Sequence, residues 1–135
     1  MRFSNREHFG LRAMVELARR YGEGPVSLAE VAEAEDISLS YLEQIIGPLR
    51  KAGMLESWRG AHGGYSLSLP PWKVTAGDVI RALEGPLVPL KCISVEDGAD
   101  TCARESCCTS RAVWQNVHER LEESLNSMTL ADLTG

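Results

Sequence analysis

All four cysteines of the chain, Cys92, Cys102, Cys107 and Cys108, lie within residues 92–108. Thiolates are good ligands for zinc and for iron–sulfur clusters, and accessible thiols are also readily oxidised. The spacing C-x9-C-x4-C-C matches neither a zinc ribbon nor a ferredoxin. Because adjacent side chains point in different directions in most backbone conformations, we expect one metal centre to use only one of the last two cysteines. The segment therefore offers three useful thiols, and a metal centre here needs a fourth ligand from elsewhere.

The composition of the chain sets the environment of these thiols. Its 135 residues, 44% of them hydrophobic, suit one compact domain or a small domain with an appendage. The charged N-terminus has no signal-peptide core, and the longest apolar runs are too short to span a membrane. We therefore expect a cytoplasmic protein with no membrane partner, in a compartment where clustered cysteines more often bind metal or sense redox state than form stable disulfides.

The net charge of −5 argues mildly against a nucleic-acid partner, because phosphate binding needs positive charge. The net charge describes the whole chain, however, and DNA contact needs positive charge only on one part of the surface. Residues 50–59 contain Arg50, Lys51 and Arg59 against one acid, Glu56. A local basic surface is therefore compatible with the acidic total.

Three helices are expected in the first third of the chain. Apolar residues recur at helical spacing in residues 6–21. Ser27 followed by Glu30 is a capping-box pattern that starts a short second helix, and Ser38 or Ser40 can cap a third. Two short helices joined by a tight polar turn are typical of a helix-turn-helix.

Pro48 is a local conflict inside the third helix. Proline lacks a backbone N–H and its ring crowds the preceding turn, so it usually bends or ends a helix. The sequence therefore predicts a helix that bends or shortens after about Ile46.

A β-hairpin is expected next, because strand-like residues flank a glycine-rich turn at residues 60–64. A helix-turn-helix followed by a two-stranded hairpin is a winged helix. Thr75 with Asp78 then caps another helix. The predicted fold class is mainly α with a small β-hairpin wing, a winged helix-turn-helix followed by a long C-terminal helix.

Residues 110–133 are expected to form that long helix, with a narrow apolar stripe recurring every three or four positions. We favour packing of this stripe against a second copy of the chain, and the alternative is that the helix folds back on its own domain. The stripe consists of Val113, Val117, Leu121, Leu125 and Met128.

The helix-turn-helix supplies candidates for DNA contact. Its second helix usually enters the major groove with its N-terminal residues toward the base edges. Here those residues are Ser38, Ser40, Tyr41 and Gln44, and a glutamine can bond an adenine edge through two hydrogen bonds. The alternative is a surface helix face without a partner.

The tip of the hairpin supplies a second set of candidates. "WRGAHGGY" places Arg59 and His62 among three glycines. An arginine on such a tip suits the narrow, negative minor groove. The alternative is an ordinary glycine-rich turn with an exposed arginine.

The stretches that carry these features together resemble a known family. "ISLSYLEQIIGPLRKAGMLESWRGAHGGYSL", "GPVSLAEVAE", "VTAGDVIRALEG" and the closing "MTLADL" are similar to the IscR-type iron–sulfur cluster regulators of the Rrf2 family, which are bacterial winged-helix repressors. The resemblance covers nearly the whole chain, and "SLSYLEQ" with "RGAHGGY" is its most specific part.

The resemblance implies a homodimeric transcription regulator, most commonly a repressor, that binds an inverted-repeat operator. Arg59 with Gly60 would enter the minor groove. A 2Fe–2S or 4Fe–4S cluster would sense redox state, nitric oxide or cluster supply. The implied division is a winged-helix domain at residues 1–84, a cluster-binding loop at 85–109, and a dimerisation helix with a tail at 110–135.

The resemblance also implies a ligand set. In relatives, the spacing of the last two ligand cysteines along the chain matches that of Cys102 and Cys108. Cys92 is then the first of the three ligands. IscR has a histidine three residues after the third cysteine, where this chain has Arg111, which cannot bind metal. Other relatives use an acidic or imidazole side chain near the N-terminus, which here is matched by His8. Cys107 and then His118 are the alternatives to His8.

Two other classes of function are alternatives to a cluster-controlled regulator. A winged-helix repressor without a cluster could bind zinc or sense oxidants through a Cys92–Cys102 or Cys102–Cys108 disulfide. An enzyme is not expected, because none of the three histidines lies in a catalytic motif and "GAHGG" lacks the lysine of a phosphate-binding loop.

Overall fold

The computed structural model describes residues 5–85 and 110–134. Its first part consists of α1 (Asn5–Arg19), α2 (Leu28–Glu35), α3 (Leu39–Lys51), β1 (Leu55–Trp58), β2 (Gly64–Leu67), the short 3-10 helix η1 (Pro71–Lys73) and α4 (Ala76–Glu84). Its second part consists of α5 (Arg111–Asn126) and α6 (Leu130–Leu133). The predicted fold class, mainly helical with a two-stranded antiparallel wing, is confirmed.

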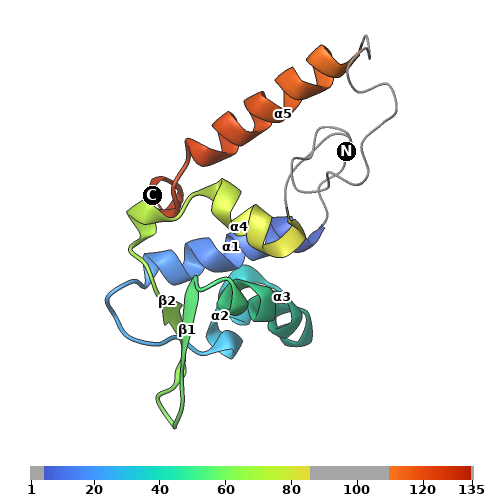
Figure 1. Cartoon of the computed structure of the whole chain (residues 1–135). Helices are drawn as coiled ribbons and strands as arrows, with labels where there is room; N and C mark the ends of the chain where they lie inside the picture. Colours follow the sequence, from blue (N-terminus) through green and yellow to red (C-terminus); the bar gives the residue numbers. More distant parts are fainter. Residues whose placement is uncertain (1–4, 86–109, 135) are drawn as a thin grey trace.

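Helix α1 is the centre of the core, because it contacts α2, α3, α4, α6 and β2 (Figure 1). Its buried positions recur at helical spacing, as the sequence pattern predicts. The other helices of the winged-helix part each turn one apolar face toward it. The largest fully buried side chains are Met14, Leu17, Val31, Leu42, Ile45, Ile46, Leu49, Val74, Val79 and Leu130.

The helix-turn-helix forms as predicted, with one detail changed. The Ser27 hydroxyl accepts a hydrogen bond from the Glu30 N–H at 3.2 Å, but the Glu30 carboxylate accepts one from Arg20 at 3.0 Å instead of closing a capping box. Asp36 ends α2 in the left-handed region at φ 52°. Ser38, and not Ser40, caps α3.

The predicted shortening of α3 after about Ile46 is wrong, because the helix continues through Pro48 to Lys51. Gly47 precedes the proline, and its lack of a Cβ relieves the crowding that proline imposes on the residue before it. The lost hydrogen bond would have been to Gln44, whose exposed position leaves its carbonyl access to water. Burial of Ile46 and Leu49 on either side of the proline holds the last turn in place.

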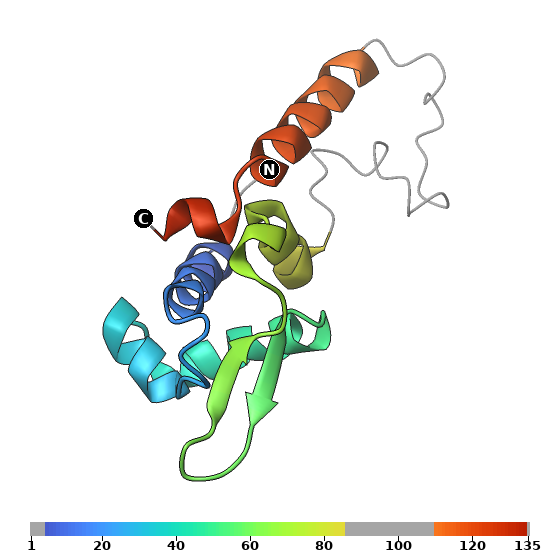
Figure 2. The same cartoon turned by 90° about the vertical axis from the view of Figure 1, so that its left-hand side faces the viewer.

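The hairpin projects from the helical part on the side away from α5 (Figures 1 and 2). Leu55 pairs with Leu67 at its buried base and Trp58 with Gly64 near its tip. Gly64 adopts φ 152°, and a Cβ there would lie 2.3 Å from the Val26 carbonyl oxygen, so the backbone can bridge Val26 to Tyr65 only with glycine at this position.

The predicted single helix over residues 110–133 is wrong, because α5 ends at Asn126 and α6 begins at Leu130. A full capping box between Thr129 and Asp132 starts α6, and Leu130 is fully buried against the winged-helix core. Met128 of the expected stripe therefore lies outside α5. Helix α5 itself projects from the core and buries none of its residues (Figure 2). In the described ranges 5–85 and 110–134, no helix has the length and apolar content to cross a membrane.

Candidate nucleic-acid interface and sensor segment

The N-terminal turn of α3 is held in one conformation by its own side chains. The Ser38 hydroxyl accepts a hydrogen bond from the Tyr41 N–H at 3.2 Å, and it lies 3.2 Å from the Ser40 hydroxyl. Both serines are exposed. The ring of Tyr41 is half-buried and packs edge-on against Phe9 of α1, with ring centroids 5.9 Å apart. Packing against Phe9 is a constraint on Tyr41 that sequence periodicity does not reveal.

Helix α3 divides into a buried and an exposed face. Positions 42, 45, 46 and 49 face the core, whereas positions 40, 43, 44, 47, 50 and 51 are exposed. The exposed positions lie three or four residues apart, so they form one stripe along the helix. Gln44 belongs to this stripe, and the structure brings it onto the same face as Ser40.

The hairpin tip carries the other predicted contacts. Arg59, Gly60 and His62 are all exposed, and Gly60 adopts φ 105°, in the left-handed region. The Gly63 N–H donates to the Gly60 carbonyl at 3.0 Å and closes the turn. The tip therefore presents an arginine and a histidine on a compact, projecting turn.

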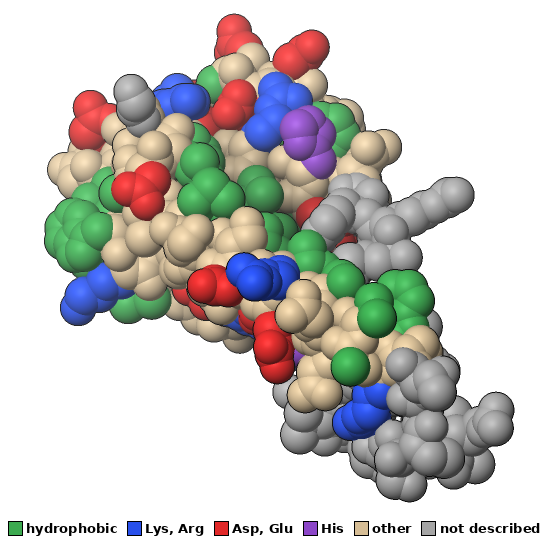
Figure 3. Space-filling view, turned by 90° about the horizontal axis from the view of Figure 1, so that it is seen from above, with side chains coloured by type: hydrophobic (Ala, Val, Ile, Leu, Met, Phe, Trp, Pro, Cys, Tyr) green, Lys and Arg blue, Asp and Glu red, His purple; other side chains and the backbone are tan. Residues whose placement is uncertain are grey.

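The face turned away from the hairpin does not concentrate positive charge. Seen from that side, acidic and basic side chains are mixed and hydrophobic ones lie between them, with no gathering of Lys and Arg (Figure 3). A DNA backbone needs concentrated positive charge, so this face is a poor platform for it. The contact surface is better sought at α3 and the hairpin.

The first turn of α1 lies beside the end of α4. Arg6 and Glu84 form an ion pair at 4.0 Å, and Glu84 is followed by Gly85, the last residue described before the cysteine segment. Glu7 is buried, whereas His8 is exposed and its ring lies 5.3 Å from that of Phe9. The end of α4, which precedes the cysteine segment in the chain, therefore lies next to the turn that carries His8.

A cavity of about 250 Å³ lies at this junction, lined by Glu7, His8, Leu11, Ile80 and Leu125 from α1, α4 and α5. The three predicted thiol ligands, Cys92, Cys102 and Cys108, lie outside the described residues, as does the alternative ligand Cys107. Within residues 5–85 and 110–134, no three His, Asp or Glu side chains are grouped so that they could hold a metal ion.

A polar clasp formed by Asp78, Arg81, Glu122 and Asn126 fastens α5 to α4. Arg81 donates to Glu122 at 2.7 Å, to Asp78 at 2.9 Å and to Asn126 at 3.0 Å. Burial raises the pKa of Asp78, but hydrogen bonds from Thr75 and Arg81 and the charge of Arg81 outweigh it, so the pKa lies below its ordinary value of 3.8. Sequence reasoning missed this clasp, whose sequence signals are the i,i+3 spacing of Asp78 and Arg81 and the i,i+4 spacing of Glu122 and Asn126.

A capped helix with an exposed polar stripe, next to a projecting hairpin with an arginine at its tip, defines a winged-helix DNA-binding protein. The chain belongs to the Rrf2 family, since the family model described as "Iron-dependent Transcriptional regulator" matches residues 3–135. It is thus a DNA-binding transcription regulator, and the resemblance drawn from the sequence is confirmed.

Its relatives include regulators with different printed descriptions. The transcriptional regulator CymR of Bacillus subtilis is 42% identical over 133 residues, covering 98% of this chain and 89% of the relative. The structure of that CymR, described as the global cysteine regulator, aligns with a TM-score of 0.80 and 41% identity over 99% of this chain and 96% of the other. IscR of T. potens aligns with a TM-score of 0.78 and 41% identity over 98% and 85%. An oxidised form of Staphylococcus aureus CymR aligns with a TM-score of 0.73 and 36% identity over 99% and 96%.

Proposed function

We propose that the chain is a homodimeric repressor of an inverted-repeat operator, and that an iron–sulfur cluster on the cysteine segment controls its DNA binding. The observation that carries this proposal is the position of the segment. It connects the end of α4, in the DNA-binding part, with the start of α5, the projecting helix. A chemical change in the segment therefore acts where the two parts of the molecule join.

In the DNA-binding half of the proposal, Ser38, Ser40, Tyr41 and Gln44 meet the major groove. Ser40 and Gln44 are exposed on one stripe, and the Ser38 cap fixes the turn from which they project. The Tyr41 ring packs against Phe9, so its hydroxyl, and not its ring face, is the group offered to DNA.

The wing meets the minor groove with Arg59, Gly60 and His62. The exposed tip places an arginine at the end of a hairpin that projects beyond α3 (Figure 1). Arginine is favoured in a narrow minor groove because the electrostatic potential there is strongly negative.

Dimerisation is proposed through α5. Val113 is 58% exposed, and Trp114 and Val117 are each 37% exposed. Three large apolar side chains on two turns of a projecting helix are costly to leave in water, and burial against a second copy removes that cost. Two copies related by a two-fold axis present two recognition helices to an inverted repeat.

The sensor half of the proposal rests on the chemistry of the donor set. Cys92, Cys102 and Cys108 supply thiolates, which suit an iron–sulfur cluster, and His8 lies on the first turn of α1, whose Arg6 pairs with Glu84 at the end of α4. Cys107 is the alternative fourth ligand. A bound cluster would supply one-electron redox chemistry, and a nitrogen ligand in place of a thiolate raises its potential.

A second candidate function is a thiol switch without a cluster. It is favoured by the relatives named as a cysteine regulator and as an oxidised form, both called CymR. In this version the same cysteines form a disulfide or bind zinc.

The experiment that separates the two is purification without oxygen, followed by a visible spectrum and measurement of iron, acid-labile sulfide and zinc. A brown protein with matching iron and sulfide supports the cluster. His8→Ala should then alter the spectrum or the lifetime of the cluster, whereas His62→Ala, which removes an exposed histidine from the wing, should not. A colourless protein that stays colourless after reconstitution supports the thiol or zinc switch, and an unchanged spectrum and lifetime in His8→Ala remove His8 from the ligand set.

A further inference from the structure

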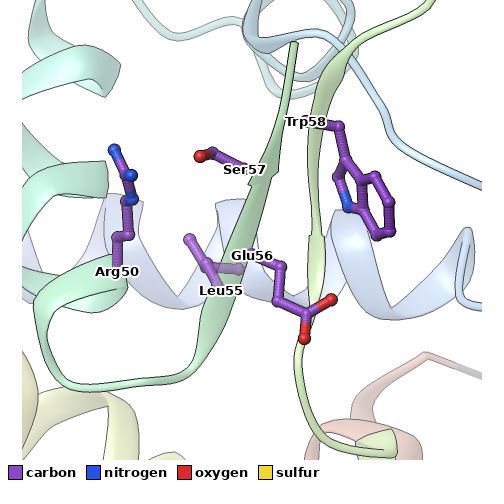
Figure 4. Close-up of a pocket in the computed structure, with 5 residues that line it drawn as sticks. All are labelled: Arg50, Leu55, Glu56, Ser57 and Trp58. Carbon is purple, nitrogen blue, oxygen red and sulfur yellow. The ribbon is translucent and has the colours of Figure 1, made fainter.

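A groove of about 480 Å³ lies between the last turn of α3 and the first strand of the wing. Arg50 of α3 and Leu55, Glu56, Ser57 and Trp58 of β1 line it. Figure 4 shows Arg50 and Ser57 on facing sides of the groove, with the Ser57 hydroxyl directed toward Arg50. Glu56 and Trp58 point to the other side of the strand, as the alternation of a β-strand requires.

The charge of Arg50 is not neutralised within the described parts of the chain. Neither its side chain nor that of Ser57 makes an ion pair or a hydrogen bond with another described residue, and both are exposed. Other arginines of the fold behave differently, since Arg19, Arg20 and Arg81 each pair with at least one carboxylate. Arg50 is therefore a cation available to an external anion, and among the described residues Lys51, Arg59 and Lys73 likewise make no ion pair.

The place of Arg50 on α3 ties the groove to the DNA-contacting surface. Arg50 follows Glu43 by seven residues, which is close to two full turns, so both lie on the exposed stripe that also carries Gln44. On its other side the groove is bounded by β1, which leads directly to Arg59 at the wing tip. A duplex that contacts both the exposed stripe of α3 and the wing tip must therefore pass its phosphate backbone over the groove between them.

We propose that this groove binds one phosphate of the DNA backbone. The planar guanidinium of Arg50 donates to two phosphate oxygens and the Ser57 hydroxyl donates to one of them. Leu55 closes the floor of the groove from within the core. This phosphate site fixes the wing relative to the recognition helix, and it rests on the proposed orientation of α3 and the wing on DNA.

Two features of the groove disfavour the binding of an anion. The C-terminal carbonyls of α3 carry partial negative charge, and Glu56 is a carboxylate on the neighbouring strand. Figure 4 shows the Glu56 carboxylate directed away from Arg50. The Trp58 Nε1–H donates to the Ser66 hydroxyl at 2.9 Å, which holds the two strands together beside the groove.

The first test is the salt dependence of DNA binding. Each neutralised phosphate contributes about −0.9 to the slope of log K against log salt concentration. Arg50→Gln should reduce the magnitude of the slope by about 0.9 on both the operator and an unrelated duplex. Arg50→Lys should keep the slope while weakening binding, because a lysine lacks the planar fork. Lys73→Gln, which removes the same charge from η1, is the matched control and should leave the slope unchanged.

The second test removes the charge from the DNA instead. Single phosphates of the operator are replaced one at a time by neutral methylphosphonates. At one position, the effects of Arg50→Gln and of the replacement on the free energy of DNA binding should be non-additive. The effects of Lys73→Gln and of the same replacement should be additive. An unchanged slope in Arg50→Gln, or additivity at every position, overturns the phosphate site while leaving the DNA-binding function intact. Failure of the unaltered protein to select any operator overturns the proposed function itself.

Discussion

Replacing Arg81 with methionine should weaken both the fold and the attachment of α5. The change keeps a long side chain but removes hydrogen bonds to Glu122 at 2.7 Å, to Asp78 at 2.9 Å and to Asn126 at 3.0 Å. Two of these partners lie on α5, so the clasp is the main polar link between the winged-helix core and the projecting helix.

The expected loss can be estimated from exposure and geometry. The side chains of Arg81, Glu122 and Asp78 are 33%, 25% and 38% exposed, so the clasp is neither buried nor fully solvated. Exposed ion pairs contribute about 0.2–1 kcal/mol and hydrogen bonds to charged groups up to about 3 kcal/mol. Three contacts that share one guanidinium are not additive, and we expect a loss of about 2 kcal/mol in the free energy of unfolding. For a chain of this length that corresponds to a fall of about 7 °C in Tm.

Thermal unfolding at one fixed protein concentration measures this loss, since any dimerisation makes Tm concentration-dependent. Arg6→Met is the matched control, because Arg6 makes one contact of 4.0 Å to Glu84 and is 41% exposed, so its loss should stay below about 0.5 kcal/mol. In a Glu122→Gln background, Arg81→Met should cost about 1 kcal/mol less. Equal Tm values for Arg81→Met and Arg6→Met would refute the clasp.

Three further predictions concern the core, the wing and the stability of the fold at low pH. Leu130→Ala should cost about 2–5 kcal/mol in chemical unfolding, because Leu130 is fully buried although α6 has only four residues, and a loss below 1 kcal/mol would show that α6 is dispensable. Arg59→Ala should weaken operator binding sharply in a titration, and unchanged affinity would remove Arg59 from the minor groove. Because the folded-state pKa of Asp78 is lowered, its carboxylate stabilises the fold above about pH 4 and loses that effect as the pH falls through the folded-state pKa. The stability difference between the native chain and Asp78→Asn should therefore shrink below about pH 4, and a difference that stays constant down to pH 3 would contradict this assignment.

Local patterns were enough to predict the winged-helix part. Thr75 and Asp78 form the expected capping box, and the glycine-rich turn at residues 60–64 joins the expected strands. Such features depend on residues a few positions apart, so the sequence contains all of the information that they need.

Features that depend on distant contacts were missed or misread. The break between α5 and α6 follows from the burial of Leu130 against the winged-helix core, although the Thr129–Asp132 pair is a capping signal present in the sequence. The continuation of α3 through Pro48 depends on the packing of its buried face. The Arg81 clasp could not be predicted, because nothing local shows that α4 and α5 are neighbours.

For the candidate site residues, the local pattern was enough to predict exposure, but it did not predict packing against distant parts of the chain. The structure places Ser40 and Gln44 on one exposed stripe and Arg59 at an exposed tip, as their pattern suggested, whereas their contacts with DNA stay predictions. Tyr41 is half-buried because Phe9, which is far away in sequence, packs against it. The assignment of Cys92, Cys102, Cys108 and His8 as cluster ligands also stays a prediction.

The proposed control of DNA binding by the cysteine segment needs a mechanical link to the recognition helices, and the order of the elements offers one. In the chain the segment follows α4, whose end lies beside Arg6, and precedes α5, whose C-terminal end is fastened to α4 by the clasp. A change in the segment can therefore shift α5, and in a dimer the direction of α5 sets the separation of the two recognition helices. An effector acts in this way only if it binds the two arrangements with unequal affinity.

The most direct test of this account is the affinity for one operator before and after the cluster is removed from the same oxygen-free preparation. The operator is first selected from a random pool of duplexes, and an inverted repeat is expected. The account predicts that loss of the cluster changes operator affinity by at least about fivefold, the lower end of typical coupling between two sites, while binding to an unrelated duplex changes little. Equal operator affinity in the two forms would contradict control of DNA binding by the cysteine segment.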